Sequence, residues 1–324
     1  MENIISSLDR QIEDALSIGR SFQFPAAYKK FSNIVFSGMG GSAIGGDILS
    51  LLNARQGKVP FQVNRLNRLP AWVDSKTLLL LSSYSGNTQE TLEAFEEGLK
   101  RKAKICILSS GGELTARARK KKLPALIIPS GLPPRCAIGY TTFSLIPALK
   151  KLGCITEGEK DFKEAVLIVR NAPREEARVL AKRLHGRSVH FYGMAGFAEP
   201  ALVRWRGQLA ENAKMLASHH LLPEMFHNET EGWLHPEKVT AQSAAVFLLD
   251  RETPGVIQRK IAALRKHIEK TGAETLEVKA RGKSFLARVF SLIILGDWTS
   301  YELALLNQVD PAVIPAIEAV KKIT

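Results

Sequence analysis

The sequence is poor in cysteine, and its few cysteines follow no recognisable pattern. Cys106, Cys136 and Cys154 are the three present, and none of them belongs to a CxxC pair. A framework of disulfides is therefore excluded. Cys106 lies in an apolar, strand-like run and is expected in the core, while Cys136 adjoins an arginine but carries no sign of an activated thiol.

Long apolar runs are missing as well, so we expect no segment that spans a membrane. Residues 1–20 carry charges throughout and have the pattern of an amphipathic helix. They lack the continuous apolar stretch of a signal peptide. The expected location of the protein is the cytoplasm.

Acidic residues are outnumbered by basic ones. The chain has 45 Lys and Arg against 32 Asp and Glu, which gives a net charge of +13. Nucleic-acid binding would fit such a balance, but the basic residues are spread along the chain and mixed with glutamates, and only 117–122 forms a short basic run. We therefore expect solvated helix faces and no nucleic-acid partner. A positive balance also suits anionic small substrates.

Strand-like apolar runs alternate with helical segments along the chain, which favours an α/β fold with parallel sheets covered on both faces. The 324 residues suffice for two domains, which we place at 1–155 and 156–324. We interpret the charged helical stretch 157–185, broken near Pro173, as their connection. The predicted strands are 34–36, 61–64, 77–83, 103–109, 125–129, 189–192, 244–249 and 275–278. The predicted helices include 47–54, 199–217 and 284–307.

A glycine-rich segment, Gly38-Met-Gly-Gly-Ser-Ala-Ile-Gly-Gly46, follows the first predicted strand. We expect it to form a loop before a helix that begins at Asp47. Such a junction suits an anion, because free N–H groups point out of the helix start and the missing Cβ atoms let a phosphate come close. Gly41 and Ser42 are the candidate phosphate-binding residues of this segment.

Two nucleotide-binding motifs are incomplete or absent. Gly38-x-Gly40-x-x-Ala43 matches the dinucleotide fingerprint, but no acid follows the second strand to hold a ribose. Arg65 at that point leaves an NADP enzyme as a minor alternative. No GxxxxGK[ST] occurs, which speaks against a nucleoside triphosphate.

A second loop, Ser83-Tyr-Ser-Gly-Asn-Thr88, places three hydroxyls between a strong strand and a helix. One of them is expected to cap the helix. Since the carboxyl ends of parallel strands share one edge of a sheet, Ser83, Ser85 and Thr88 can converge with the glycine segment on one small anion. A phosphate monoester fits this arrangement better than a pyrophosphate.

Metal-binding patterns are also missing. His219 and His220 precede His227, but the spacing lacks the i, i+4 pairing of a helical zinc site and no acidic ligands accompany it. We expect neither a metal nor another cofactor.

Taken alone, the other polar residues of interest have ordinary interpretations. Glu211 could pair with Arg206 or Lys214 on a helix, and His227 could make a structural hydrogen bond in a loop. Arg135 could be a surface residue, and Lys321 a normal helix end.

Together, the glycine segment and the hydroxyl loop resemble the sugar isomerase (SIS) domain. The similarity is greatest to the archaeal and bacterial bifunctional phosphoglucose/phosphomannose isomerases, and it extends through nearly the whole chain. The further segments that carry it are Gly131-Leu-Pro-Pro-Arg135, Glu211-Asn-Ala-Lys214, Pro223-Glu-Met-Phe-His-Asn-Glu229 and the Asp310-Pro start of the tail.

The resemblance implies two αβα-sandwich SIS-type domains with central parallel sheets. It also implies an isomerase that interconverts glucose 6-phosphate, and mannose 6-phosphate, with fructose 6-phosphate through an enediol. Glu211 would move the proton between C1 and C2, and Arg135 would stabilise the enediolate. His227 would open the sugar ring in the other subunit's site of a homodimer, and Lys321 would hold the ring oxygen or hydroxyls.

Other functions share these features. A sugar-phosphate-binding regulator would use the same phosphate site without chemistry, but it would usually add a helix-turn-helix domain, for which 1–32 is expected to be too short. Another SIS isomerase would act on a different sugar phosphate. The related enzymes tend to have Thr in an Asp-Pro-Thr-Pro-Val tail segment where this chain has Ala312. A hydroxyl there is linked to acceptance of both epimers, so Ala312 bears on the mannose 6-phosphate activity.

Overall fold

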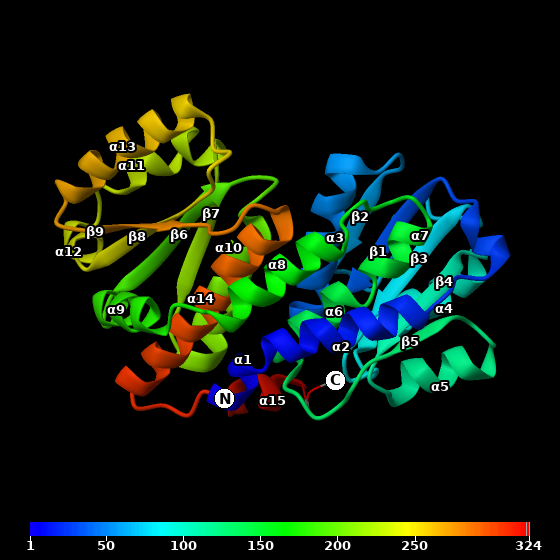
Figure 1. Ribbon diagram of the computed structural model, residues 1–324. Coiled ribbons are helices and arrows are strands. Elements are labelled where there is room, and N and C mark those ends of the chain that lie inside the picture. The colour runs from blue at the N-terminus through cyan, green and yellow to red at the C-terminus, as the bar shows by residue number, and fades with distance from the viewer. Residues whose placement is uncertain (322, 324) are drawn as a thin grey trace. The chain divides into compact units, whose positions relative to one another are not determined.

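The computed structural model describes residues 1–321 and 323; Lys322 and Thr324, which end the predicted second domain, lie outside the described residues. The chain forms two compact units. The first unit is Ser6–Glu159, and the second unit joins Met1–Ile5 to the chain from Lys160 onward. Each unit has one parallel sheet with helices on both faces (Figure 1), which confirms the predicted α/β class.

The first unit is built around a five-stranded sheet of order β2-β1-β3-β4-β5, parallel throughout. Its central strands are almost wholly buried and apolar, as expected where both faces are covered. Gly38 lies beside Ser82 in the register, so the glycine segment and the hydroxyl loop leave the same edge of the sheet. The strands are β1 (Asn33–Gly38), β2 (Phe61–Asn64), β3 (Thr77–Ser82), β4 (Lys104–Ser109) and β5 (Ala125–Ile127).

Two helix layers cover this sheet (Figure 1). On one face, Phe95 and Leu114 pack against Leu79 and Ile105 of the central strands. On the other face, the ring of Phe36 lies directly under Gly46. The helices are α2 (Leu8–Ser21), α3 (Gly40–Gln56), α4 (Gln89–Lys100), α5 (Gly112–Lys120), α6 (Ile138–Phe143) and α7 (Ile146–Lys151), with 3₁₀ turns at Ala26–Lys29 and Pro134–Cys136.

The second unit has a four-stranded parallel sheet of order β7-β6-β8-β9. The edge strand β7 was not predicted. In its sequence, Ala-Ser-His-His-Leu-Leu, three of six residues are polar and only Leu222 is buried, so it lacks the apolar run that reveals the central strands. The strands are β6 (Ser188–Met194), β7 (Ala217–Leu222), β8 (Ser243–Leu249) and β9 (Glu274–Lys279).

The helices of the second unit again lie on both faces of the sheet (Figure 1). The predicted break near Pro173 is confirmed, but the two helices that flank it belong to the second unit, where α9 packs along α14. The helices are α1 (Glu2–Ser6), α8 (Glu159–Arg170), α9 (Arg174–Leu184), α10 (Glu199–Gln208), α11 (Glu229–Gly232), α12 (Glu237–Ala241), α13 (Gly255–Glu269), α14 (Phe285–Leu306) and α15 (Pro315–Lys321). A π-helical turn spans Leu209–Ala213, and a 3₁₀ turn spans Glu224–His227.

Helix α14 corrects one expectation from the sequence. Its 22 residues are long and apolar enough to cross a membrane by length and composition, although we expected no such segment. Most of its apolar stretch, 83%, is buried inside the protein. A helix enclosed by its own unit must be apolar on nearly every side, which explains why a core helix passes the same test.

Candidate active site

The glycine segment is a helix rather than a loop. Helix α3 begins at Gly40, seven positions before the predicted start at Asp47. The glycines inside it allow close packing: a Cβ on Gly41 would lie 2.9 Å from the Cα of Arg135, and one on Gly45 would lie 2.6 Å from the carbonyl oxygen of Thr141. Gly41 and Ser42 therefore lie in the first helical turn, and the N–H of Ser42 donates to the carbonyl of the N-cap residue Met39 at 3.0 Å.

Ser42 links the glycine segment to the hydroxyl loop. The main-chain N–H of Tyr84 donates to Ser42 Oγ at 3.3 Å, and Ser42 is buried. The structure thus brings the two predicted phosphate-binding segments together at one edge of the first sheet.

The hydroxyl loop folds back on itself. Ser83 Oγ and Thr88 Oγ1 lie 2.9 Å apart, and the N–H of Gly86 donates to Ser83 Oγ at 3.1 Å. The N–H of Asn87 donates to Ser85 Oγ at 3.2 Å. The expected side-chain cap is wrong: Thr88 occupies the N-cap position of α4, but its hydroxyl accepts no bond from that helix. Ser83 is buried, whereas Ser85 is exposed.

A third loop, 109–112 between β4 and α5, supports the hydroxyl loop and was missed in the sequence. The N–H of Leu114 donates to the Gly86 carbonyl at 2.9 Å, and the N–H of Glu113 donates to Asn87 Oδ1 at 2.9 Å. Gly86 has a φ of +73°, and a Cβ there would lie 1.9 Å from the carbonyl oxygen of Gly111. The sequence Ser-Ser-Gly-Gly after a strand repeats the pattern of the first loop and could have revealed it.

Arg135 is buried, not a surface residue, and it sits in a 3₁₀ turn that two prolines introduce. The chain that leads to it is held by Tyr84, whose hydroxyl donates to the Pro129 carbonyl and accepts from the N–H of Leu132, both at 2.9 Å. Burial raises the pKa of the Tyr84 phenol. Tyr84 therefore joins the hydroxyl loop to the segment that carries Arg135.

In the second unit, Glu211 lies in the π-helical turn that ends the α10 segment. The predicted helix 199–217 is too long, since α10 ends at Gln208 and the π turn at Ala213. π-Helical turns inside helices often occur at functional sites. Asn212 Nδ2 donates to Ser300 Oγ of α14 at 2.9 Å in the buried interior, which fixes the turn against the core.

Buried polar contacts hold the helix behind this turn. Arg204 donates to both carboxylate oxygens of Asp297 at 2.8 Å, and Gln208 Nε2 donates to Asp297 Oδ1 at 3.0 Å. The indole of Trp205 donates to the Leu292 carbonyl at 2.8 Å. Buried hydrogen bonds to α14 therefore fix the helix from which the turn with Glu211 starts.

His227 is exposed and ends the 3₁₀ turn Glu224–His227. The next helix is anchored by Glu229, whose carboxylate accepts from the Tyr192 hydroxyl and lies 2.6 Å from His220 Nδ1. Burial, and then the charge of Glu229, raises the pKa of Tyr192. The buried side chain of Met225 holds the 3₁₀ turn itself.

Lys321 is the last residue of α15 and is exposed. The segment before this helix includes Ala312, whose N–H donates to Asp310 Oδ1 at 2.7 Å. Lys214, next to the π turn, donates from Nζ to the Asp310 carbonyl at 2.8 Å. Glu211, His227 and Lys321 thus lie on three separate segments of the second unit.

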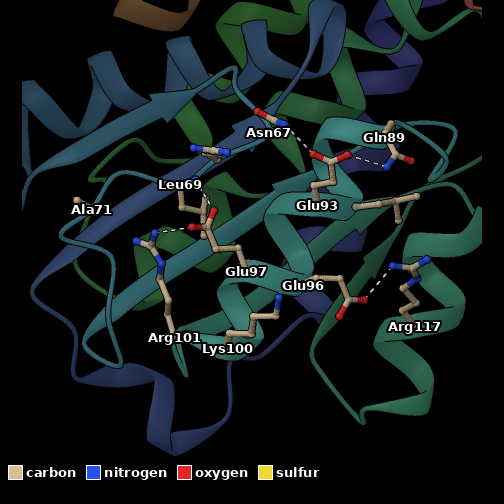
Figure 2. Close-up of a pocket in the computed structure, with 12 residues that line it drawn as sticks. Asn67, Leu69, Ala71, Gln89, Glu93, Glu96, Glu97, Lys100, Arg101 and Arg117 are labelled. Carbon is tan, nitrogen blue, oxygen red and sulfur yellow. Dashed lines mark hydrogen bonds and ion pairs between the residues drawn. The ribbon is translucent and has the colours of Figure 1, made fainter. Parts of the chain in front are cut away.

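A groove of about 760 Å³ lies on the first unit between the segment 67–71 and helices α4 and α5 (Figure 2). Its carboxylates are engaged by their neighbours. Glu97 accepts from the Leu69 N–H and pairs with Arg101, and Glu96 pairs with Arg117 at 2.8 Å. These contacts give Glu96 and Glu97 partners within the protein.

No group of three or more His, Cys, Asp or Glu side chains is arranged to hold a metal ion in the described part of the chain. The three cysteines form no disulfide and are buried, and burial raises the pKa of Cys106 strongly and that of Cys154 to about 11. The core position predicted for Cys106 is confirmed.

The chain is similar to several known proteins. Residues 174–323 match the bacterial phospho-glucose isomerase C-terminal SIS domain. A bifunctional phosphoglucose/phosphomannose isomerase of Caldicellulosiruptor bescii is 36% identical over 98% of this chain and 96% of its own. A D-glucosamine-6-phosphate 4-epimerase of Sulfolobus acidocaldarius is 32% identical over 71% of this chain and 72% of its own. The crystal structure of a putative phosphosugar isomerase from Clostridium difficile 630 has the same fold, with a TM-score of 0.77, 12% identity and coverage of 100% and 97%.

Proposed function

Since the chain belongs to the family of bifunctional phosphoglucose/phosphomannose isomerases, we propose that it interconverts glucose 6-phosphate and mannose 6-phosphate with fructose 6-phosphate. The observation that carries the proposal is the 36% identity with one such enzyme along nearly the whole of both chains. The chain is an isomerase of sugar phosphates; the identity of the sugars and the mechanism are the proposal.

The phosphate is proposed to bind at the edge of the first sheet where the glycine segment and the hydroxyl loop meet. Gly41 and Ser42 offer the N-terminal end of α3, which favours an anion. Ser83, Ser85 and Thr88 offer hydroxyls within one loop. Their contacts to each other and to N–H groups keep the hydroxyls in place before the substrate arrives, which lowers the cost of binding.

The proton transfer is assigned to Glu211. Its carboxylate would take the proton from C2 of the open-chain aldose and return it to C1, while the hydroxyl proton at O2 moves to O1. The intermediate is an enediolate, and the fixed positive charge of Arg135 would stabilise it. These steps need no redox partner, because the sugar is oxidised at C2 and reduced at C1.

Ring opening is assigned to His227, because an imidazole can exchange protons near neutral pH. Its exposed position on a well-anchored turn fits a role in the site of a partner subunit. Lys321 would hold the ring oxygen or hydroxyls. We therefore propose a homodimer in which His227 acts across the interface.

Purified protein assayed side by side with glucose 6-phosphate, mannose 6-phosphate and arabinose 5-phosphate tests the substrate class. We expect turnover of the first two, with Ala312 in place of Thr lowering the mannose 6-phosphate rate relative to glucose 6-phosphate. Turnover of the pentose phosphate alone, or binding of sugar phosphates without turnover, would contradict the proposal.

The substitution Glu211→Gln tests the mechanism. It should lower kcat by about 10²- to 10⁴-fold and leave KM nearly unchanged, because it removes the base but keeps the shape of the side chain. The matched control is Glu237→Gln at an exposed helix start, which should retain wild-type kcat. Unchanged turnover in Glu211→Gln would sink the assignment of the base.

Mixing inactive variants tests the shared site. If His227 acts in the partner's site, Glu211→Gln and His227→Asn subunits will form heterodimers with one intact site, so the mixture recovers about a quarter of wild-type activity. No recovery after subunit exchange would place His227 in its own subunit's site.

The epimerase relative supports a second candidate function, the 4-epimerisation of D-glucosamine 6-phosphate. Adding that compound to the same assay decides between the two. Turnover of the amino sugar with none of glucose 6-phosphate would favour the epimerase.

A further inference from the structure

Lys214 makes an unusual set of contacts. It follows the π turn with a left-handed backbone, φ 58° and ψ 34°. Its ammonium donates to the carbonyl oxygens of Glu211, Asp310 and Val313 at 2.7, 2.8 and 2.8 Å. A lysine ammonium has three protons, and each of them has a main-chain acceptor at short range.

A helix cap alone would not need this arrangement. A lysine near the end of a helix commonly donates to a last-turn carbonyl, and the bond to Glu211 is of this kind. The other two acceptors lie 96 and 99 positions further along the chain. Asn307 adds a second tie, since its Nδ2 donates to the Ala213 carbonyl at 2.8 Å. The π turn and the segment 307–313 are therefore joined by polar bonds from both sides.

These bonds matter because they reach the segment that leads into the C-terminal helix α15. Helix α15 has no buried residue, and every residue of 315–321 is exposed. Apolar burial normally supplies most of the stability of a docked helix. The contacts of Lys214 supply polar bonds to the segment that precedes this helix.

We propose that Lys214 is a positioning residue that fastens the segment 310–313, and with it α15, to the turn that carries Glu211. The inference rests on the proposed function, in which Glu211 and Lys321 both serve the isomerisation. Lys214 acts through the main chain of these segments. Without it, the tail detaches and Lys321 is no longer held on the same frame as the proposed base.

The test combines hydrogen–deuterium exchange with kinetics on the full chain. Lys214→Met keeps the length of the side chain but removes the ammonium. We expect exchange in 309–321 to rise about tenfold while exchange in the first unit is unchanged, and kcat for glucose 6-phosphate to fall about tenfold. The matched control is Lys102→Met, since Lys102 is also exposed and has the same φ of 58° at the end of a helix.

The exchange result separates this inference from the proposed function. If the wild-type protein shows no isomerase activity, the proposed function is refuted. Increased exchange of 309–321 in Lys214→Met would still support the positioning role of Lys214. If Lys214→Met changes neither exchange nor kcat, the positioning role of Lys214 is overturned and the isomerase assignment stands. Should Lys214→Met fail to fold, Lys214→Asn replaces it, because asparagine tolerates the left-handed backbone. The proposal limits the role of Lys214 to holding the C-terminal segment. Global unfolding of both variants would therefore also overturn it.

Discussion

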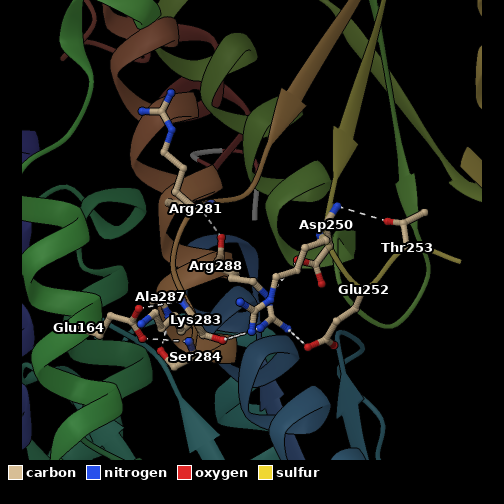
Figure 3. Close-up of polar contacts among 11 residues, drawn as sticks. Glu164, Asp250, Glu252, Thr253, Arg281, Lys283, Ser284, Ala287 and Arg288 are labelled. Atoms are coloured by element: carbon tan, nitrogen blue, oxygen red, sulfur yellow. Dashed lines mark hydrogen bonds and ion pairs between the residues drawn. The ribbon is translucent and has the colours of Figure 1, made fainter. Parts of the chain in front are cut away.

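The carboxyl edges of the two sheets have the same backbone plan and opposite chemistry. At the first edge, the chain turns from β1 and β3 into helices through Ser42, Ser83 and Thr88, which present neutral hydroxyls and N–H groups. At the second edge, the chain after β8 and β9 surrounds a buried arginine, Arg288 of α14 (Figure 3). Both edges are places where parallel sheets usually bind ligands.

At the second edge, the positive charge of Arg288 is already paired with carboxylates of the same chain. Arg288 Nε lies 2.9 Å from Asp250 Oδ1, and Nη2 lies 2.8 Å from Glu252 Oε1, as close ion pairs rather than aligned hydrogen bonds. Its Nη1 donates to the Lys283 carbonyl at 2.7 Å. The guanidinium also lies 5.7 Å from the ring centre of Phe197.

A carboxylate of the chain also binds the main chain just before the start of α14. Glu164 accepts from the N–H groups of Lys283 and Ser284 at 2.7 and 2.9 Å (Figure 3). Burial raises the pKa of Glu164, but these backbone bonds, together with the Ser284 hydroxyl and the charge of Lys283, leave the pKa lowered. The comparison shows that the fold provides two edges with the same backbone plan. At the second edge, carboxylates of the chain itself already bind the arginine and the main-chain N–H groups.

The largest loss of stability that we predict comes from removing the ion pairs of Arg288 at the second edge. Arg288→Met removes the cation and leaves the buried carboxylate of Asp250 without its partner. Breaking a buried ion pair in this way costs about 3–5 kcal/mol of unfolding free energy. Urea unfolding measures the loss, and we expect KM for the sugar phosphate to stay unchanged in the folded fraction.

The control for this experiment is Arg251→Met. Arg251 is exposed and donates to the same Lys283 carbonyl at 2.8 Å, so its loss should cost less than about 1 kcal/mol. A large increase in KM for Arg288→Met would mean that the second edge also contributes to substrate binding, and the contrast between the edges would fail.

The next effect in size comes from breaking the first edge with Gly86→Ala. The new Cβ would meet the Gly111 carbonyl oxygen, and the left-handed φ of +73° adds backbone strain. We expect a loss of about 2 kcal/mol or more in unfolding free energy and an increase in KM of about tenfold, because the hydroxyl loop must move.

Gly153→Ala is the control that separates the effect of backbone strain from the effect of a steric clash of the new Cβ. Gly153 has nearly the same φ, +74°, but no atom lies within 4 Å of its added Cβ. It should lose only about 1 kcal/mol through strain and keep wild-type KM. If both variants bind the sugar phosphate equally well, the hydroxyl loop is not part of the phosphate site.

The sequence predicts the sheets well because their central strands are continuous apolar runs. Phe61–Asn64 is predicted to the residue, and the strand before the hydroxyl loop is predicted to within one residue. The edge strand β7 escapes prediction because a strand with one neighbour and a half-exposed face carries polar residues such as His219 and His220.

The site is only partly predictable for a different reason. Glycine is a poor helix former, so local propensity places the start of α3 after Gly46 rather than at Gly40. The true start depends on close packing against residues 134–141, which lie far along the chain. The bonds of Lys214 likewise depend on acceptors nearly a hundred positions away. Such contacts leave no local pattern.

The smallest effect that we predict concerns Tyr84, which ties the first edge to the chain that carries Arg135. Tyr84→Phe leaves the Pro129 carbonyl and the Leu132 N–H without their partner, at a cost of about 1–2 kcal/mol. The loss loosens the segment before Arg135, so we expect a modest increase in KM for the sugar phosphate. Tyr301→Phe of the second unit is the control and should leave KM unchanged.

The pH dependence of stability further distinguishes Tyr84→Phe from the control Tyr301→Phe. Burial raises the pKa of Tyr84 and of Tyr301 in the folded protein above that of a free phenol, which is about 10. The folded state therefore holds these protons more tightly, so their contribution is complete below about pH 10 and is lost as pH rises through the folded pKa. Urea unfolding at pH 8 and pH 10.5 should show a smaller alkaline loss of stability for either variant than for wild type. Only Tyr84→Phe should combine that smaller loss with a raised KM, because only Tyr84 belongs to the phosphate-binding edge.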